Sequence, residues 1–195
     1  MHRRELLRWL SATAALEALG SLAPADLLAL GRDVHARAQG GPALRVLDAL
    51  ARRTVELAAE RIIPATDTPG ATDANVVAFV DRMLADWYAA DERDRFMAGL
   101  RELDARARTQ RGKAFAECGE ADQVALLAAL DDEVTAMRRA RGGGAANAHW
   151  FAMLKWMTAF GYCTSEVAMT RTFGAWPMPG RYDACAPVAL RRAGG

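Results

Sequence analysis

The sequence predicts an all-α protein, a single helical bundle of about five to six helices with an extended, Pro- and Gly-rich C-terminal tail. Alanine is the commonest residue, and with Leu, Arg and Glu it gives the composition of helices. Isoleucine occurs only at positions 62 and 63, and a chain so poor in β-branched residues is a weak candidate for a sheet. Apolar residues also recur at spacings of three and four, the period of an amphipathic helix. We therefore expect the bundle at 39–175 and the tail at 176–195.

Residues 1–38 allow two interpretations. Arg3 and Arg4 precede a weakly apolar stretch, as in a twin-arginine export signal, and this stretch is too short to span a membrane. Against this interpretation, Glu17 places a charge inside the stretch, and the helical pattern continues past Asp26. The alternative is an ordinary amphipathic N-terminal helix. The Gln-Gly-Gly-Pro sequence at 39–42 is the best boundary between this region and the bundle.

The first half of the bundle contains three expected helices. The first runs from about residue 43 to 62, and Pro64 ends it because proline lacks a donor and restricts the residue before it. Turn-forming residues follow at 64–71, and Thr72 or Asp73 is expected to cap the second helix. Asp91 begins the third. The apolar stripes of the second and third helices are Val76, Val80, Met83 and Trp87, and Phe96, Leu100, Leu103 and Ala107.

Two further helices are expected after a short segment around Phe115. The first spans 120–141 and ends at three consecutive glycines; its inward residues are Val124, Leu127, Leu130, Val134 and Met137. The second spans about 147–171 and has apolar side chains around most of its circumference. Such a helix is either central to a bundle or half covered by a partner. The tail that follows is rich in proline but carries aromatic residues, so we expect it to pack on the bundle or on a partner.

Motifs for chemistry are missing from the sequence, and we expect no cofactor and no metal in this chain. The formal net charge of +1 offers no basic face for nucleic acid. There is no Gly-rich phosphate loop, no His-Glu-x-x-His pair and no haem attachment sequence. Three cysteines stand far apart, and their disulfide state stays open: Cys118, Cys163 and Cys185.

Three segments together resemble the gluconate 2-dehydrogenase subunit 3 family. The first, at 62–71, has the sequence Ile-Ile-Pro-Ala-Thr-Asp-Thr-Pro-Gly-Ala. The second is Phe-Ala-Met-Leu-Lys at 151–155, which leads into Gly-Tyr-Cys-Thr-Ser-Glu at 161–166. The third is Pro-Gly-Arg-Tyr at 179–182, close to Cys185. Together with the arginine pair at the start, the resemblance extends over most of 43–187.

The resemblance implies an accessory role without catalysis. In this family a large FAD-dependent subunit of the glucose–methanol–choline type oxidises the sugar or gluconate, and a cytochrome c or another acceptor takes the electrons. The small subunit binds the large one, assists its folding and lends its twin-arginine signal for export. The resemblance thus implies a periplasmic location, with membrane association only through the complex. A cytoplasmic folding chaperone with an uncleaved N-terminus is an alternative.

Two hypotheses assign residues to function. In the first, a partner contacts the last helix and the tail, and the expected contacts are Trp156, Phe160, Tyr162, Glu166, Trp176, Pro179 and Tyr182. Arg3 and Arg4 would form the export signal. In the second, the chain is a stand-alone helical enzyme or a small-molecule-binding bundle that uses Ser165, Glu166 and Asp67. A serine nucleophile would still need a base and an orienting acid.

Overall fold

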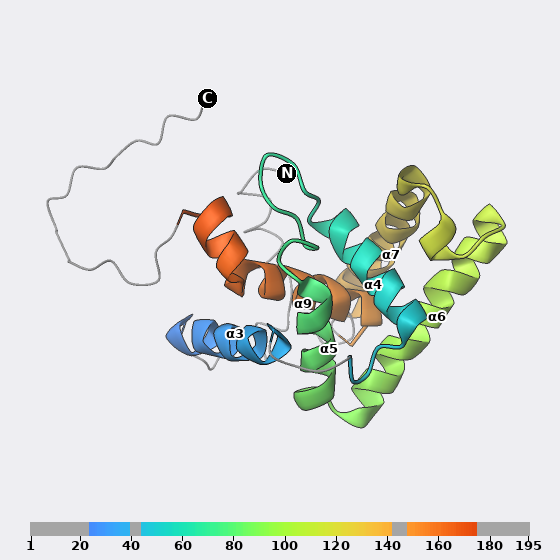
Figure 1. Cartoon of the computed structure of the whole chain (residues 1–195). Helices are drawn as coiled ribbons and strands as arrows, with labels where there is room; N and C mark the ends of the chain where they lie inside the picture. The colour runs from blue at the N-terminus through green and yellow to red at the C-terminus, as the bar shows by residue number, and fades with distance from the viewer. Residues whose placement is uncertain (1–23, 40–43, 142–147, 175–195) are drawn as a thin grey trace, which may run out of the picture.

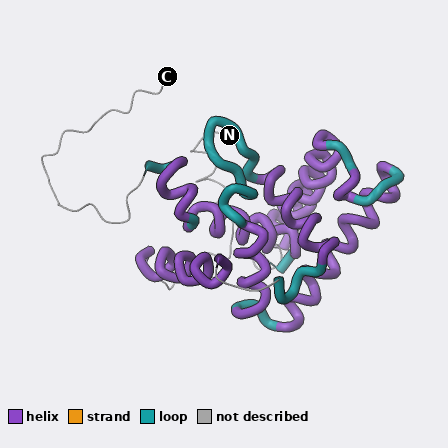
Figure 2. Tube along the Cα trace, in the orientation of Figure 1, coloured by secondary structure: helices purple, strands orange, loops and turns teal. Residues whose placement is uncertain are grey.

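The computed structural model describes residues 24–39, 44–141 and 148–174, and this part of the chain is helical without a strand (Figures 1 and 2). It confirms the all-α bundle. The elements in order are α3 (Pro24–Gln39), α4 (Ala49–Ile62), α5 (Val76–Asp86), α6 (Ala90–Arg111), the 3₁₀ turn η1 (Phe115–Glu117), α7 (Glu120–Arg141), α9 (Trp150–Thr164) and the π-helical turn η2 (Ala168–Thr172). Arg3, Arg4 and the predicted tail lie outside the described residues.

Helix α9 is the centre of the bundle. It contacts α3, α4, α5, α6 and α7, and Figure 1 shows it between α3 on one side and α6 and α7 on the other. Its buried side chains include three aromatic residues at the N-terminal end and in the middle, Trp150, Phe151 and Trp156. The helix buries most of its circumference against the chain itself, which is the first of the two arrangements expected from its composition.

The predicted last helix is too long, because α9 ends at Thr164 rather than near residue 171. The Ser165 hydroxyl donates to the Tyr162 carbonyl over 2.7 Å and accepts from the Ala168 amide over 3.1 Å. A serine side chain that bonds the backbone in this way competes with the helical ladder. The chain therefore leaves the α-helix at Ser165 and continues into η2.

A buried carboxylate explains why α4 begins at Ala49 rather than at residue 43. The Asp81 side chain, on α5, is 3% exposed and accepts hydrogen bonds from the amides of Arg45, Val46 and Leu47 at 2.8–2.9 Å. These bonds hold 45–47 in a non-helical conformation. Asp48 then caps α4 by accepting from the Ala51 amide.

Three expectations about single residues in α5 and α7 were wrong. Helix α5 begins at Val76, and its N-cap is Asn75 in the left-handed conformation rather than Thr72 or Asp73. Trp87 follows the end of α5 and is 53% exposed, and Val124 of α7 is 46% exposed while its neighbour Leu126 is buried. Trp87 lies beyond the end of its helix, and the buried face of α7 is turned toward Gln123 and Leu127, which leaves Val124 outside it.

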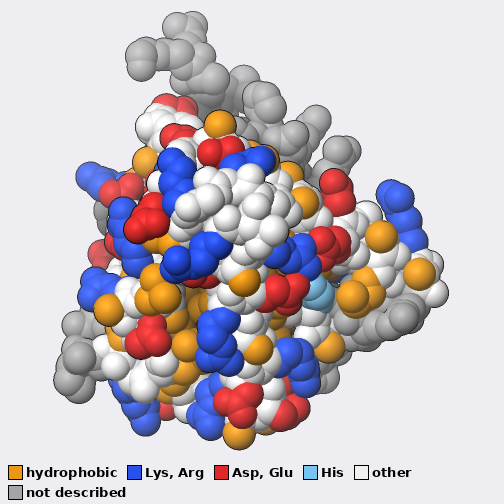
Figure 3. Space-filling model, turned by 90° about the vertical axis from the view of Figure 1, so that its right-hand side faces the viewer, with side chains coloured by type: hydrophobic (Ala, Val, Ile, Leu, Met, Phe, Trp, Pro, Cys, Tyr) orange, Lys and Arg blue, Asp and Glu red, His pale blue; other side chains and the backbone are white. Residues whose placement is uncertain are grey.

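The bounds of the other helices agree with the predictions. Helix α6 begins one residue before Asp91, and α7 has the expected bounds. Charged side chains of both signs are interspersed on the face shown in Figure 3. Within the described ranges, no helix combines the length and the apolar character needed to cross a bilayer.

Candidate functional site

The loop between α4 and α5, residues 63–75, contains most of the segment 62–71, the first of the three segments named in the sequence analysis. One carboxylate holds this loop. Glu60, in the last turn of α4, accepts from the Ala65 amide through Oε1 and from both the amide and the hydroxyl of Thr72 through Oε2, at 2.6–2.9 Å. These bonds join the two ends of the loop across its base. Figure 2 shows the loop projecting from the helices that it connects.

Gly70 lets the loop close tightly. A Cβ at this position would lie 2.5 Å from the Ala65 nitrogen and 2.5 Å from Glu60 Oε1, so a larger residue would push the two sides of the loop apart. The Gly70 amide donates to Asp73 Oδ2 over 2.9 Å, and the Ala71 amide donates to the Ile63 carbonyl over 2.9 Å. Hydrogen bonds within the loop and the close approach at Gly70 thus fix its backbone conformation.

Tyr162 of α9 attaches the loop to the bundle. Its side chain is 1% exposed, and its hydroxyl donates to the Pro69 carbonyl over 2.6 Å. Because that bond uses the only proton of the phenol, the Thr172 hydroxyl donates to the Tyr162 oxygen over 2.8 Å. Burial raises the pKa of Tyr162, which keeps the phenol protonated. Two of the recognised segments therefore meet at this side chain, which the sequence alone did not indicate.

The tip of the loop is exposed. Ala65, Thr66 and Asp67 face solvent, and the Thr66 hydroxyl donates to the Asp67 carboxylate over 2.9 Å. A shallow hollow lies beside the base of the loop and is lined by Arg52, Glu56, Ala59, Ala71, Thr72, Asn75 and Val77. The site is a rigid loop that displays polar side chains, an arrangement suited to recognition.

The residues of the enzyme hypothesis are not assembled. Ser165 is 3% exposed and its hydroxyl is engaged with two backbone groups, as described above. Glu166 is exposed, and in the described part of the chain no hydrogen bond or ion pair reaches its carboxylate. Asp67 is at the loop tip, where it accepts from Thr66. No described base contacts the serine hydroxyl, so the structure gives no support to a serine nucleophile here.

The predicted partner contacts fall into two groups. Trp156, Phe160 and Tyr162 are 8% exposed or less and belong to the core, where the first two rings stack with centroids 4.9 Å apart. Glu166 is the exposed one among the four in α9 and the turn after it. Trp176, Pro179 and Tyr182 lie outside the described residues. Partner contact by these seven residues stays a prediction.

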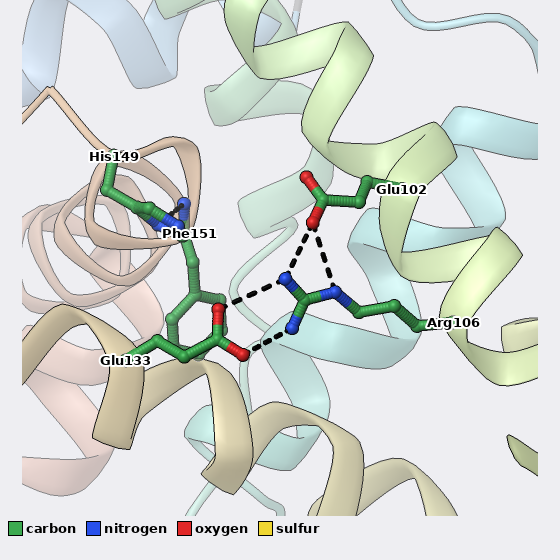
Figure 4. A network of polar contacts seen from close by, with 5 residues as sticks. All are labelled: Glu102, Arg106, Glu133, His149 and Phe151. Carbon is green, nitrogen blue, oxygen red and sulfur yellow. Dashed lines mark hydrogen bonds and ion pairs between the residues drawn. The ribbon is translucent and has the colours of Figure 1, made fainter.

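A second group of polar side chains lies where α6, α7 and the start of α9 meet (Figure 4). Arg106 contacts Glu102 on its own helix over 2.6 Å and Glu133 on α7 over 2.5 Å, and these hydrogen bonds hold the pKa of the Glu133 carboxyl below its usual range. His149 caps α9 through Nδ1, which accepts from the Phe151 amide over 3.2 Å. Burial lowers the pKa of His149. Glu133 joins α7 to α6 through Arg106, and Glu102 holds Arg106 from its own helix, so both carboxylates have a structural role.

Metal ligands and thiols give no further site. Among the residues that the structure describes, no three His, Cys, Asp or Glu side chains are grouped to hold a metal ion. Cys118 is buried, and both it and Cys163 are free thiols. Burial raises the pKa of Cys163 to about 12, so this thiol is a poor nucleophile near neutral pH. Cys185 lies outside the described residues.

Sequence analysis missed Glu60 as a site residue. A loop of a dozen residues carries many backbone donors, and each needs an acceptor when the loop packs on the bundle. An acidic side chain in the last turn of the preceding helix is placed to supply such an acceptor. This position, together with Gly70, was the available signal.

Replacing Glu60 by Gln is expected to lower the free energy of opening the loop by about 1–2 kcal/mol, because a single amide oxygen cannot accept all three hydrogen bonds. Amide exchange in peptides covering 65–72 should become faster while exchange in α7 stays unchanged. Glu56→Gln is the matched control, one turn earlier on α4, where the carboxylate pairs with the exposed Arg53. Equal exchange rates in the two variants would contradict the role given to Glu60.

Comparison with known proteins gives one match. The family model described as Gluconate 2-dehydrogenase subunit 3 matches residues 49–180. The match includes α4, the loop, and α9 with η2, and thus both recognised segments that the structure describes. No curated protein and no solved structure matches the chain.

Proposed function

Because the matching family model spans more than half of the sequence, the chain belongs to the gluconate 2-dehydrogenase subunit 3 family, and from this premise we propose that it is a non-catalytic accessory subunit of a sugar or gluconate dehydrogenase complex. Its partner is the large subunit, which carries FAD and performs the oxidation. A cytochrome c subunit is a further member of the complex.

The loop at 63–75 is the observation that carries this proposal. Its backbone is fixed by Glu60 and by Tyr162, whereas Thr66 and Asp67 at its tip face solvent. A surface that is held rigid before binding loses little conformational entropy on association. The polar groups at the base of the loop are used to hold it, which favours recognition of a protein over catalysis. We assign the loop tip as a contact with the large subunit.

Export is the second part of the proposal. Arg3 and Arg4 form a twin-arginine signal that takes the folded complex to the periplasm, where it meets the membrane only through its other subunits. The small subunit also assists folding of the large one before export. The family membership supports this part, and the arginine pair is its sequence evidence.

Co-expression with the FAD-dependent large subunit of a sugar or gluconate dehydrogenase tests the partnership. We expect the tagged chain to recover the flavoprotein, and the double variant Thr66→Ala with Asp67→Ala to recover at least about tenfold less of it, a loss of about 1.4 kcal/mol. Asp132→Ala, an exposed position on α7, is the matched control and should behave as the unaltered chain. A stable monomeric chain that does not bind the flavoprotein would refute the proposal.

The export part has its own experiment. Arg3→Lys together with Arg4→Lys should leave both subunits in the cytoplasm while the recovered complex stays intact. Fractionation of cells followed by detection of the flavoprotein measures this. Periplasmic flavoprotein in the double variant would argue for export by another route, and an unchanged cytoplasmic location in both strains would favour the chaperone alternative.

A further inference from the structure

The contact of α3 with the bundle includes three buried residues in the described range 28–36. It packs on α5 and α9 (Figure 1). Among the side chains at 28–36, only Gly31, Val34 and His35 are buried, and Leu28 is 38% exposed. At Gly31 the helix lies against Thr164 of α9, so closely that a Cβ would be 2.4 Å from the Thr164 Cβ. The described part of this contact therefore includes a glycine, a valine and a histidine, and Leu30 is partly buried against the core.

His35 makes a polar bond at the centre of this contact. Its Nε2 lies 2.6 Å from the Gly161 carbonyl oxygen, and its ring packs on the Phe79 ring with centroids 4.8 Å apart. A carbonyl accepts but cannot donate, so Nε2 carries the proton and the neutral ring has its lone pair on Nδ1. The side chain is 7% exposed. A second proton would therefore place a positive charge in a buried site.

The ionisable groups of the helices packed against His35 are engaged elsewhere. On α5, Asp81 accepts from the backbone of 45–47, and Asp86 pairs with Arg45 and Arg82. On α9, Lys155 pairs with Asp131, Tyr162 bonds Pro69, and Cys163 is a protonated thiol. On α3 itself, Arg32 and Asp33 are exposed neighbours of the histidine. No carboxylate on α5 or α9 is placed to compensate an imidazolium.

We propose that α3 is a strap that leaves α5 and α9 when His35 is protonated, uncovering Phe79 and Gly161. The inference goes beyond the accessory role and does not rest on it. Once α3 is released, the His35 side chain is solvated and its pKa returns to the ordinary histidine value of 6.5.

The direction of the effect follows from the two states of His35. Burial lowers the pKa of His35 in the docked state, and the hydrogen bond to Gly161 opposes burial but is the smaller effect. A lowered pKa means that the released state binds more protons, so docking is complete above pH 6.5 and weakens as the pH falls below it. The docking equilibrium loses about tenfold per pH unit until the lowered pKa is reached.

Hydrogen exchange of the full chain between pH 7.5 and 5.0, corrected for the intrinsic pH dependence of exchange, tests the strap. Peptides covering 28–36 should lose up to about tenfold in protection for each pH unit below 6.5, while peptides from α7 keep theirs. His35→Gln keeps a donor for Gly161 but cannot be protonated, so its α3 should stay protected throughout. His149→Gln is the matched histidine control and should behave as the unaltered chain.

Gly31→Ala provides the released reference, because its Cβ cannot fit against Thr164. Its α3 should exchange at pH 7.5 as the unaltered α3 does at pH 5.0. If His35→Gln cannot dock at any pH, the midpoint of the α3 change is compared with the pKa of His35 measured by NMR, and the two should coincide. A pH-independent α3, or a change abolished by His149→Gln, would overturn the proposal.

Discussion

Replacing Asp81 by Asn is expected to lower the free energy of unfolding by about 3–5 kcal/mol. The carboxylate is 3% exposed and accepts from three consecutive amides, at 45, 46 and 47. Asparagine has one acceptor oxygen, and its amide group would direct hydrogens toward amides that also need an acceptor. At least one buried donor would lose its partner, and the segment before α4 would lose its conformation.

Asp86→Asn is the matched control for this effect. Asp86 lies on the same helix, five residues further along, and contacts the side chains of Arg45 and Arg82. Partly exposed ion pairs contribute little, so this variant should change stability by less than about 1 kcal/mol. Urea unfolding followed by far-UV circular dichroism compares the two variants. Similar losses in both would show that Asp81 acts as a surface charge rather than as a buried acceptor.

Gly99→Ala is expected to lower the free energy of unfolding by about 2 kcal/mol or more, although alanine is the better helix former. A Cβ on Gly99 of α6 would lie 2.0 Å from Trp150 Cγ on α9. The indole is 4% exposed and its edge meets the Phe96 ring, with centroids 6.5 Å apart. A rigid, enclosed ring has no free rotamer to adopt, so α6 and α9 would have to separate.

Gly119→Ala is the control for the glycine prediction, because no atom lies within 4 Å of the added Cβ. Its stability should stay within about 0.5 kcal/mol of the unaltered chain. Thermal unfolding and the near-UV signal of the tryptophans measure both variants. A Gly99→Ala protein that unfolds at the temperature of the Gly119→Ala protein would contradict the close approach of α6 and α9.

Periodicity was sufficient to predict most of the fold, since the bounds of α7 and the central place of α9 follow from it. The failures share a physical cause, namely contacts between elements far apart in the sequence. Nothing near residue 45 indicates that the amides of 45–47 will donate to Asp81. The predicted start of α4, at residue 43, is therefore too early in the sequence. Val124 fits the apolar stripe of α7, but the buried face of the helix takes in the polar Gln123 and leaves Val124 exposed.

The candidate site could be predicted only in pieces. The turn-rich sequence at 64–71 indicated a loop, and Tyr162 was singled out on α9, but their bond to each other depends on how α9 lies under the loop. The aromatic side chains at 156 and 160 were expected to meet a partner, and the structure places them in the chain's own core. Composition measures how much apolar surface a helix has, whereas packing decides what covers it.

The Tyr162 oxygen has a mechanical consequence. The phenol group accepts a hydrogen bond from the Thr172 hydroxyl and donates one to the Pro69 carbonyl. It therefore links two segments that are separated by about a hundred residues of chain. A displacement of the loop that breaks the bond to Pro69 frees the phenol proton, and the hydrogen bond with Thr172 can then reverse its polarity. The loop and η2 are thereby coupled through a single side chain of α9.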